Sequence, residues 1–82
     1  MEMRIDKFLK VSRLIKRRSV AADACGTSRV YLNGRPAKPA ARVKIGDEIR
    51  IEFGASVLHA VIKSLNEKVS KEEASALYEI IG

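Results

Sequence analysis

The chain has 82 residues, which is enough for one compact domain and excludes a multidomain enzyme. Hydrophobic residues make up 46% of the sequence and charged residues 32%, the balance of a folded globular domain and not of a disordered chain. Lysine and arginine outnumber aspartate and glutamate by 16 to 10, and the net charge of +6 suits a polyanionic partner.

The charge is distributed unevenly along the chain. Residues 1–44 contain twelve basic and three acidic residues, a net +9, whereas residues 45–82 contain four basic and seven acidic residues, a net −3. This concentration favours nucleic acid as the partner, although a basic face on a small domain is often merely solvated. Aromatic residues make up only 5% of the sequence, so stacking of bases on aromatic side chains is not expected.

The first predicted element is a helix near the N-terminus. Ile5, Phe8 and Leu9 recur at helical spacing, while the basic residues of the same segment fall on the opposite side of the helical wheel. This pattern predicts a helix with one packed face and one cationic face.

A basic connection at residues 16–18 leads into a second predicted helix. Ser19 is a good N-cap, and the packed face of this helix would contain Val20, Ala21 and Ala24. The N-terminus of a helix carries a partial positive charge and free backbone N–H groups. Together with the neighbouring cations, it would suit a phosphate.

Alternating hydrophobic residues predict a β-sheet in the middle of the chain. Val30 and Leu32 precede Asn33-Gly34, the dipeptide that most favours a tight type I′ hairpin. Pro36 and Pro39 prevent a long strand after that turn.

Two further strands are predicted after a second turn. Ile49, Ile51 and Phe53 alternate with charged residues, so all three are expected to be buried, and replacing Phe53 with alanine should strongly destabilise the domain. Residues 56–65 are rich in valine, leucine and isoleucine and fit one more strand.

The last predicted element is an amphipathic helix. Ser70 and Glu73 have the spacing of a capping box. The apolar residues that follow recur at helical spacing, at Ala74, Leu77, Tyr78 and Ile81.

The sequence offers little for metal or thiol chemistry. The single cysteine, Cys25, and the single histidine, His59, cannot make an internal disulfide or a four-ligand zinc site, and no cofactor is expected. Cys25 is expected to be a buried helix residue and His59 an ordinary strand residue. Asp6 is expected to be a local helix partner and Asp47 to stabilise its turn. No apolar run is long enough for a membrane span or a signal peptide, so a cytoplasmic protein without a membrane partner is expected.

Taken in order, several segments resemble the S-four RNA-binding domain family; they are residues 4–9, 13–19, 30–34, 38–39 and 43–49. The resemblance implies one domain over residues 1–82, with the RNA-binding core at 4–53 and a C-terminal strand and helix at 54–82. It implies an α+β fold in which two short N-terminal helices pack on a small antiparallel or mixed sheet. Ser28 departs from the family, which usually has glycine there, and a serine with positive φ would be strained.

Within this family the chain is similar to bacterial ribosome-associated quality-control proteins. That similarity implies binding to rRNA of stalled large ribosomal subunits that carry peptidyl-tRNA, beside a quality-control factor that recruits alanyl-tRNA and adds an alanine tail without a template. The chain is also similar to small ribosome-associated heat-shock proteins, so a factor that recycles large subunits blocked by a nascent chain remains an alternative, as does a general structured-RNA-binding module. By position, the basic residues that would face RNA are Arg4, Lys7, Arg13, Lys16, Arg17 and Arg18, with Lys38 a weaker candidate.

Three other classes of function receive little support from the sequence. The same domain occurs fused to catalytic domains, but this chain has no glycine-rich cofactor loop and no room for such a domain, so no enzyme activity is expected. A membrane-surface or purely structural partner module is disfavoured by the acidic second half of the chain. The protein is expected to be a monomer.

Overall fold

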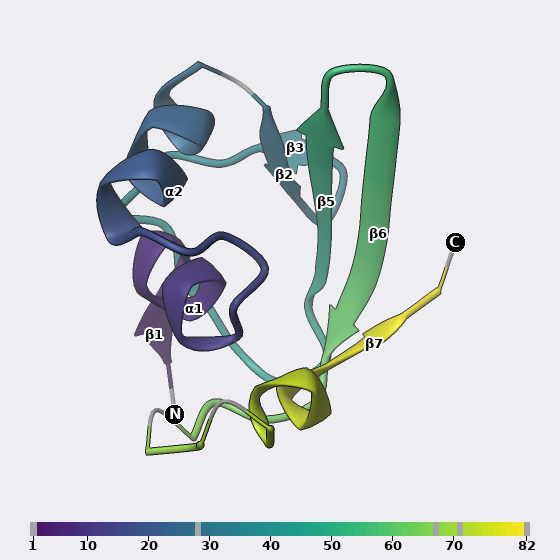
Figure 1. Cartoon of the computed structure of the whole chain (residues 1–82). Helices are drawn as coiled ribbons and strands as arrows, with labels where there is room; N and C mark the ends of the chain where they lie inside the picture. Colours follow the sequence, from purple (N-terminus) through teal and green to yellow (C-terminus); the bar gives the residue numbers. More distant parts are fainter. Residues whose placement is uncertain (1, 28, 67, 71, 82) are drawn as a thin grey trace.

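The computed structural model describes residues 2–27, 29–66, 68–70 and 72–81, without the side chains of Arg18 and Ser19. Two helices lie beside an antiparallel sheet of five strands in the order β3-β2-β5-β6-β7 (Figure 1). A second sheet pairs β1 with β4. This is the predicted α+β arrangement; Ser28 lies outside the described residues. Within the described ranges, no helix has the length and apolar character needed to cross a membrane.

Helix α1, Ile5–Val11, has the predicted packed face. Ile5, Phe8 and Leu9 are fully buried. Ser12 is the C-cap of the helix, and the next residue, Arg13, has a φ of 63°, which turns the chain away from the helix axis.

Helix α2, Arg18–Gly26, begins earlier than predicted. Its N-cap is Arg17, whose side chain makes no capping hydrogen bond, so the prediction of Ser19 as the N-cap is wrong. The predicted packed face is also only partly right, because Val20 is 50% exposed whereas Ala21 and Cys25, one helical turn apart, are buried. Helix α2 packs against α1 and strand β2, so the burial of Ala21 and Cys25 fixes its orientation.

The predicted hairpin is confirmed. Strands β2, Val30–Leu32, and β3, Arg35–Pro36, pair directly across Asn33-Gly34, whose φ angles of 51° and 85° are those of a type I′ turn. Strand β5, Glu48–Phe53, pairs with β2 and with β6, Ser56–Ile62. Strands β1, Met3–Arg4, and β4, Arg42–Val43, form the separate antiparallel pair.

The Asn33-Gly34 turn is linked to the turn before β5. The Asn33 Oδ1 accepts a hydrogen bond from the Glu48 N–H at 2.9 Å. Asp47, only 7% exposed, accepts hydrogen bonds from the Asn33 amide at 3.3 Å and from the Lys44 N–H at 3.0 Å. Asp47 therefore stabilises its turn, as predicted, and also holds the two turns together.

One predicted core residue is not in the core. Ile49 and Ile51 are buried, but Phe53 is 45% exposed, so the prediction of Phe53 as a buried residue is wrong. Phe53 is the last residue of β5 and pairs with Ser56 beside the Gly54-Ala55 turn. Apolar and charged residues alternate up to the last residue of β5, but the side chains that bury Ile49 and Ile51 do not extend far enough to bury Phe53.

The predicted C-terminal helix is replaced by one turn of 3-10 helix and a strand. The Glu73 N–H donates to Ser70 Oγ at 3.3 Å, but the N-cap of the helical turn that follows is Glu73 and not Ser70, so the predicted capping box does not cap a helix. The 3-10 helix η1, Ala74–Leu77, then leads directly into strand β7, Tyr78–Ile80, which pairs antiparallel with β6. The exposed edge of β6 supplies backbone partners that a continued helix would leave unused, and tyrosine and isoleucine favour a strand.

Candidate nucleic-acid interface

Nearly all the basic residues in the first half of the chain have exposed side chains. Of the twelve in residues 1–44, ten are exposed, Lys7 is half-buried, and the side chain of Arg18 lies outside the described part of the chain. One of the three acidic residues in this half, Asp6, is buried. The positive charge therefore lies largely on the surface.

The connection between α1 and α2 brings two predicted residues together. Arg13 and Lys16 line a hollow of about 250 Å³ with Lys10 from α1, and Val69 from the C-terminal part of the chain closes one side. The connection is held by the Arg13 N–H, which donates to the Lys10 carbonyl at 3.1 Å, and by Ile15, whose N–H donates to Leu9 at 3.0 Å and whose side chain is buried. Three cations are thus presented from one short turn.

Arg17 and Arg18 stand at the start of α2. The Arg17 side chain is exposed, and its carbonyl accepts the first helical hydrogen bond, from the Ala21 N–H at 3.0 Å. Arg18 is the first helical residue. These positions add basic residues to the positive end of the helix dipole, where an anion is favoured.

Arg4 has a structural partner as well as an exposed surface. Its guanidinium lies 3.0 Å from the carboxylate of Asp6, and the two side chains are 45% and 4% exposed. The Lys7 N–H also donates to Asp6, at 2.7 Å, so Asp6 is the local helix partner that the sequence predicts. Lys7 is half-buried on α1 and contributes less open surface than Arg4.

Pairing between distant strands adds a basic residue that the sequence pattern did not reveal. In the β1–β4 pair, Arg42 is the partner of Arg4. Lys38 lies in the segment between β3 and β4 and lines a second hollow together with Arg35. A usable signal was present in the sequence, because residues 24–46 contain five basic residues and no acidic residue.

Two of the four basic residues of the second half, Arg50 and Lys63, have side-chain partners on the sheet. The Arg50 guanidinium lies 4.2 Å from the centre of the Tyr31 ring, and the Lys63 ammonium lies 3.1 Å from the Glu79 carboxylate. His59, a residue of β6 as predicted, has its Nε2 3.6 Å from Glu48. Arg50 and Lys63 therefore each contact a side chain of the sheet, and they serve as controls for the exposed cations of the first half.

Cys25 is a packed residue and not a reactive thiol. It is only 4% exposed, as predicted, and its burial, followed by the negative charge of Asp6, raises the pKa of the thiol to about 11. The thiolate is the nucleophilic form, and little of it is present at neutral pH. Among the described residues, no group of three or more His, Cys, Asp or Glu could hold a metal ion.

Comparison with known proteins gives a consistent result. Residues 3–49 match the S4 domain. The chain is 53% identical over 78 residues to the RQC P-site tRNA stabilizing factor of Halalkalibacterium halodurans, covering 95% of this chain and 89% of that protein. It is 44% identical over 79 residues to the protein of that name in Bacillus subtilis, covering 96% and 92%.

A solved structure shares the whole fold. The trimeric structure of Vibrio cholerae Heat Shock Protein 15 superposes with a TM-score of 0.90 at 32% sequence identity, covering 99% of this chain and 83% of that chain. The S4 match covers more than half of the chain, and the identity to the stabilizing factors extends over nearly all of it. The chain therefore belongs to the S4 domain family and, within it, to the family of the RQC P-site tRNA stabilizing factors.

Proposed function

We propose that the protein binds structured RNA of the large ribosomal subunit, together with the tRNA in its P site, during ribosome-associated quality control. The observation that carries this proposal is the set of ten exposed basic side chains in residues 1–44. The name of the relatives, RQC P-site tRNA stabilizing factor, supports a tRNA-related role in quality control.

The surface suits recognition of RNA by shape and phosphate contacts. Double-stranded RNA offers side chains little access to its deep major groove, so proteins bind it largely through phosphates and 2′-hydroxyls. The guanidinium groups can each hold a phosphate with two parallel hydrogen bonds, and the lysines add point charges. The proposed contacts are Arg4, Lys7, Arg13, Lys16, Arg17, Arg18 and Lys38, to which the structure adds Lys10 through its place in the hollow with Arg13.

The proposed substrate is a stalled large subunit that still carries peptidyl-tRNA. The protein would act in the cytoplasm by binding and not by catalysis, holding the tRNA while a separate quality-control factor recruits alanyl-tRNA and extends the nascent chain with alanine. The RNA-binding core would be residues 4–53, and residues 54–82 would complete the sheet. Val69 supports a contribution of the C-terminal part to the site, because it lines the same hollow as Lys10, Arg13 and Lys16.

Co-sedimentation with purified large subunits tests the proposal. Subunits that carry peptidyl-tRNA in the P site should retain the protein, whereas small subunits should not. Lys16→Gln should weaken the association, and Lys63→Gln, which removes a lysine paired with Glu79, should leave it unchanged. Equal retention by large and small subunits would contradict the proposal.

The similarity to the heat-shock protein structure favours a second candidate function. A factor of that type would bind large subunits blocked by a nascent chain and promote their recycling without alanine addition; the support for it is the close match of the folds. A reconstituted tailing reaction separates the two functions. Dependence of alanine incorporation on this protein favours quality control, and unchanged incorporation favours recycling.

A further inference from the structure

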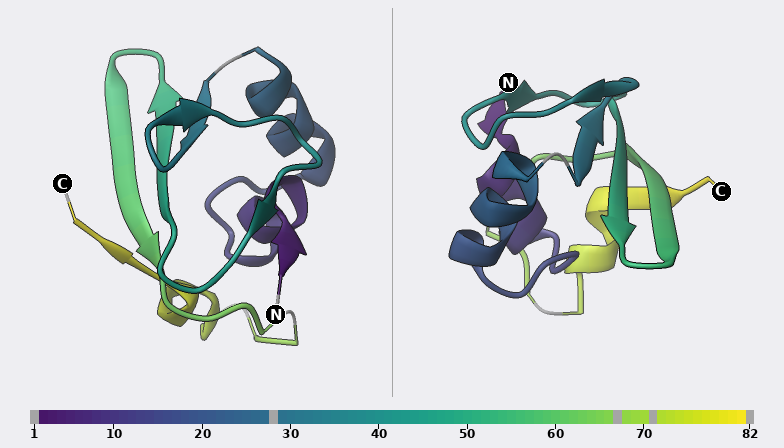
Figure 2. Two further views of the ribbon diagram at one scale, coloured as in Figure 1. Left: turned by 180° about the vertical axis from the view of Figure 1, so that it is seen from behind. Right: turned by 90° about the horizontal axis from the view of Figure 1, so that it is seen from above.

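The segment between β3 and β4 borders an open hollow, and of the proposed RNA contacts only Lys38 lines it. Seen from behind, this segment leaves the sheet, passes the helices and reaches β1 (Figure 2). The hollow has a volume of about 530 Å³, within the range of about 300–1,000 Å³ that is typical of small-molecule sites.

Hydrogen bonds hold the walls of the hollow in place. The Ala37 N–H donates to the Val30 carbonyl at 2.9 Å, and the Ala41 carbonyl accepts from the Ile5 N–H at 2.7 Å. The segment is therefore fastened to β2 at one end and to the start of α1 at the other.

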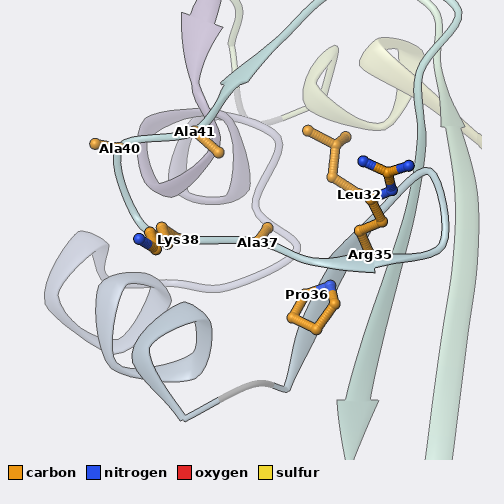
Figure 3. A pocket seen from close by; sticks show the side chains of 7 residues that line it. All are labelled: Leu32, Arg35, Pro36, Ala37, Lys38, Ala40 and Ala41. Carbon is orange, nitrogen blue, oxygen red and sulfur yellow. The ribbon is translucent and has the colours of Figure 1, made fainter.

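The interior of the hollow is apolar and its charged residues are all basic. Leu32, Ala37 and Ala41 point toward one another across it, and Pro36 forms a further part of the wall (Figure 3). Arg35 and Lys38 are exposed, and no acidic residue lines the hollow. Among the described residues, neither Arg35 nor Lys38 has an ion-pair partner.

The hollow is continuous with the basic surface. Arg42 follows Ala41 directly and is the strand partner of Arg4. Ala41, which lines the hollow, also accepts a hydrogen bond from the Ile5 N–H, so an RNA strand bound at the start of α1 would pass next to the hollow. An occupant that combines an anionic group with a less polar part fits these residues better than a purely ionic one, because the apolar side chains offer no partner for a second charge.

We propose that this hollow holds an unpaired nucleobase of the bound RNA, with Arg35 and Lys38 on the flanking phosphates. The inference rests on the proposed RNA-binding function and adds a specificity element to it. RNA is read most selectively at bulges and loops, where an unstacked base can leave the helix. Here the base would lie against Leu32, Ala37 and Ala41, which point into the hollow, while the two cations hold the backbone on either side of it.

Two short RNA hairpins provide the probe. One carries 2-aminopurine as a single-nucleotide bulge and the other carries it base-paired in the stem; this base fluoresces more when it leaves the stack. The protein should bind the bulged hairpin about tenfold more tightly and raise its fluorescence. Ala41→Leu, which fills the hollow, and Arg35→Gln should each remove both effects.

Matched controls make the result specific. Ala55→Leu makes the same change at an exposed alanine of the Gly54-Ala55 turn, which does not line the hollow, and Arg50→Gln removes an equal charge beside Tyr31. Both should retain the preference for the bulge. If thermal melting shows that Ala41→Leu is unfolded, Arg35→Gln decides, because its side chain is exposed.

The outcomes separate this inference from the proposed function. Equal affinity for the two hairpins, or binding to large subunits but to neither hairpin, would overturn the nucleobase site and leave ribosome binding intact. Failure to bind large subunits as well would count against the proposed function itself. An oligoglutamate peptide whose binding is blocked by Ala41→Leu, without competition from the bulged RNA, would show that the hollow is a peptide site and overturn the inference.

Discussion

At the scale of single residues, Arg13 combines an unfavourable backbone with an exposed charge. A φ of 63° places a residue with a Cβ in the left-handed region, where glycine is favoured by about 1 kcal/mol. Arg13→Gly should therefore keep or raise the melting temperature while it weakens binding to large subunits.

Arg42→Gly is the control for the effect of Arg13→Gly on stability. Its φ is not positive, and it lies in strand β4, so Arg42→Gly removes an equal charge without relieving strain. This variant should lose stability by roughly 0.5–1 kcal/mol. A lower melting temperature for Arg13→Gly as well would show that the left-handed turn depends on the arginine side chain.

Arg4 should affect both folding and binding. Its guanidinium is an ion-pair partner of Asp6, which is almost fully buried, and a buried carboxylate that loses a charged partner costs on the order of 1–3 kcal/mol. Arg4→Ala should reduce the free energy of unfolding in urea by that order. Combining it with Asp6→Asn should recover part of the loss, and strictly additive effects of the two substitutions would contradict a direct interaction.

Cys25 should react slowly in the folded protein. A thiol pKa raised from 9.0 to about 11 lowers the thiolate fraction at pH 8 about a hundredfold. Alkylation by iodoacetamide should therefore be slow in buffer and fast in urea. As the pH rises, the thiol of the unfolded chain loses its proton before the thiol of the folded protein does. The buried neutral Cys25 therefore contributes fully to the free energy of unfolding below pH 9, and this contribution is lost as the pH rises toward 11. Rapid alkylation of the folded protein at pH 8 would contradict this burial.

At the scale of secondary structure, the two apolar residues of β5 should differ sharply. Ile51 is 1% exposed and Phe53 is 45% exposed. Ile51→Ala should reduce the free energy of unfolding by about 2–5 kcal/mol, whereas Phe53→Ala should cost well under half as much. Urea denaturation of both variants tests this, and equal losses would show that Phe53 packs more tightly than its exposure indicates.

Local sequence rules predicted the elements whose causes are local. Asn33-Gly34 fixes a type I′ turn because both residues accept positive φ, and the spacing of Ile5, Phe8 and Leu9 identifies the buried face of α1. The C-terminal segment shows the limit of such rules. The Ser70–Glu73 hydrogen bond forms, but it caps no helix, and the pairing of Tyr78–Ile80 with β6 depends on a strand that lies earlier in the sequence.

At the scale of the whole molecule, the same distinction applies to the candidate interface. The excess of basic residues in 1–44 is visible in the sequence, and the turn at Arg13 gathers neighbours that are close along the chain. Arg42 could not be placed beside Arg4 from local patterns, because the β1–β4 pair joins residues far apart in sequence. The Arg4–Asp6 pair is local, and the sequence predicted Asp6 as a local partner, but the near-complete burial of Asp6 is set by the whole fold.

The central claim is that exposed cations of the first half bind ribosomal RNA. The most direct test is the affinity for large subunits carrying peptidyl-tRNA, measured over a range of salt concentrations. The logarithm of the affinity should fall linearly with the logarithm of the salt concentration, and Lys16→Gln should reduce the slope by about 0.7–0.9, the value for one phosphate contact. Lys63→Gln should leave the slope unchanged. An affinity that is independent of salt, or an equal effect of both substitutions, would contradict the claim.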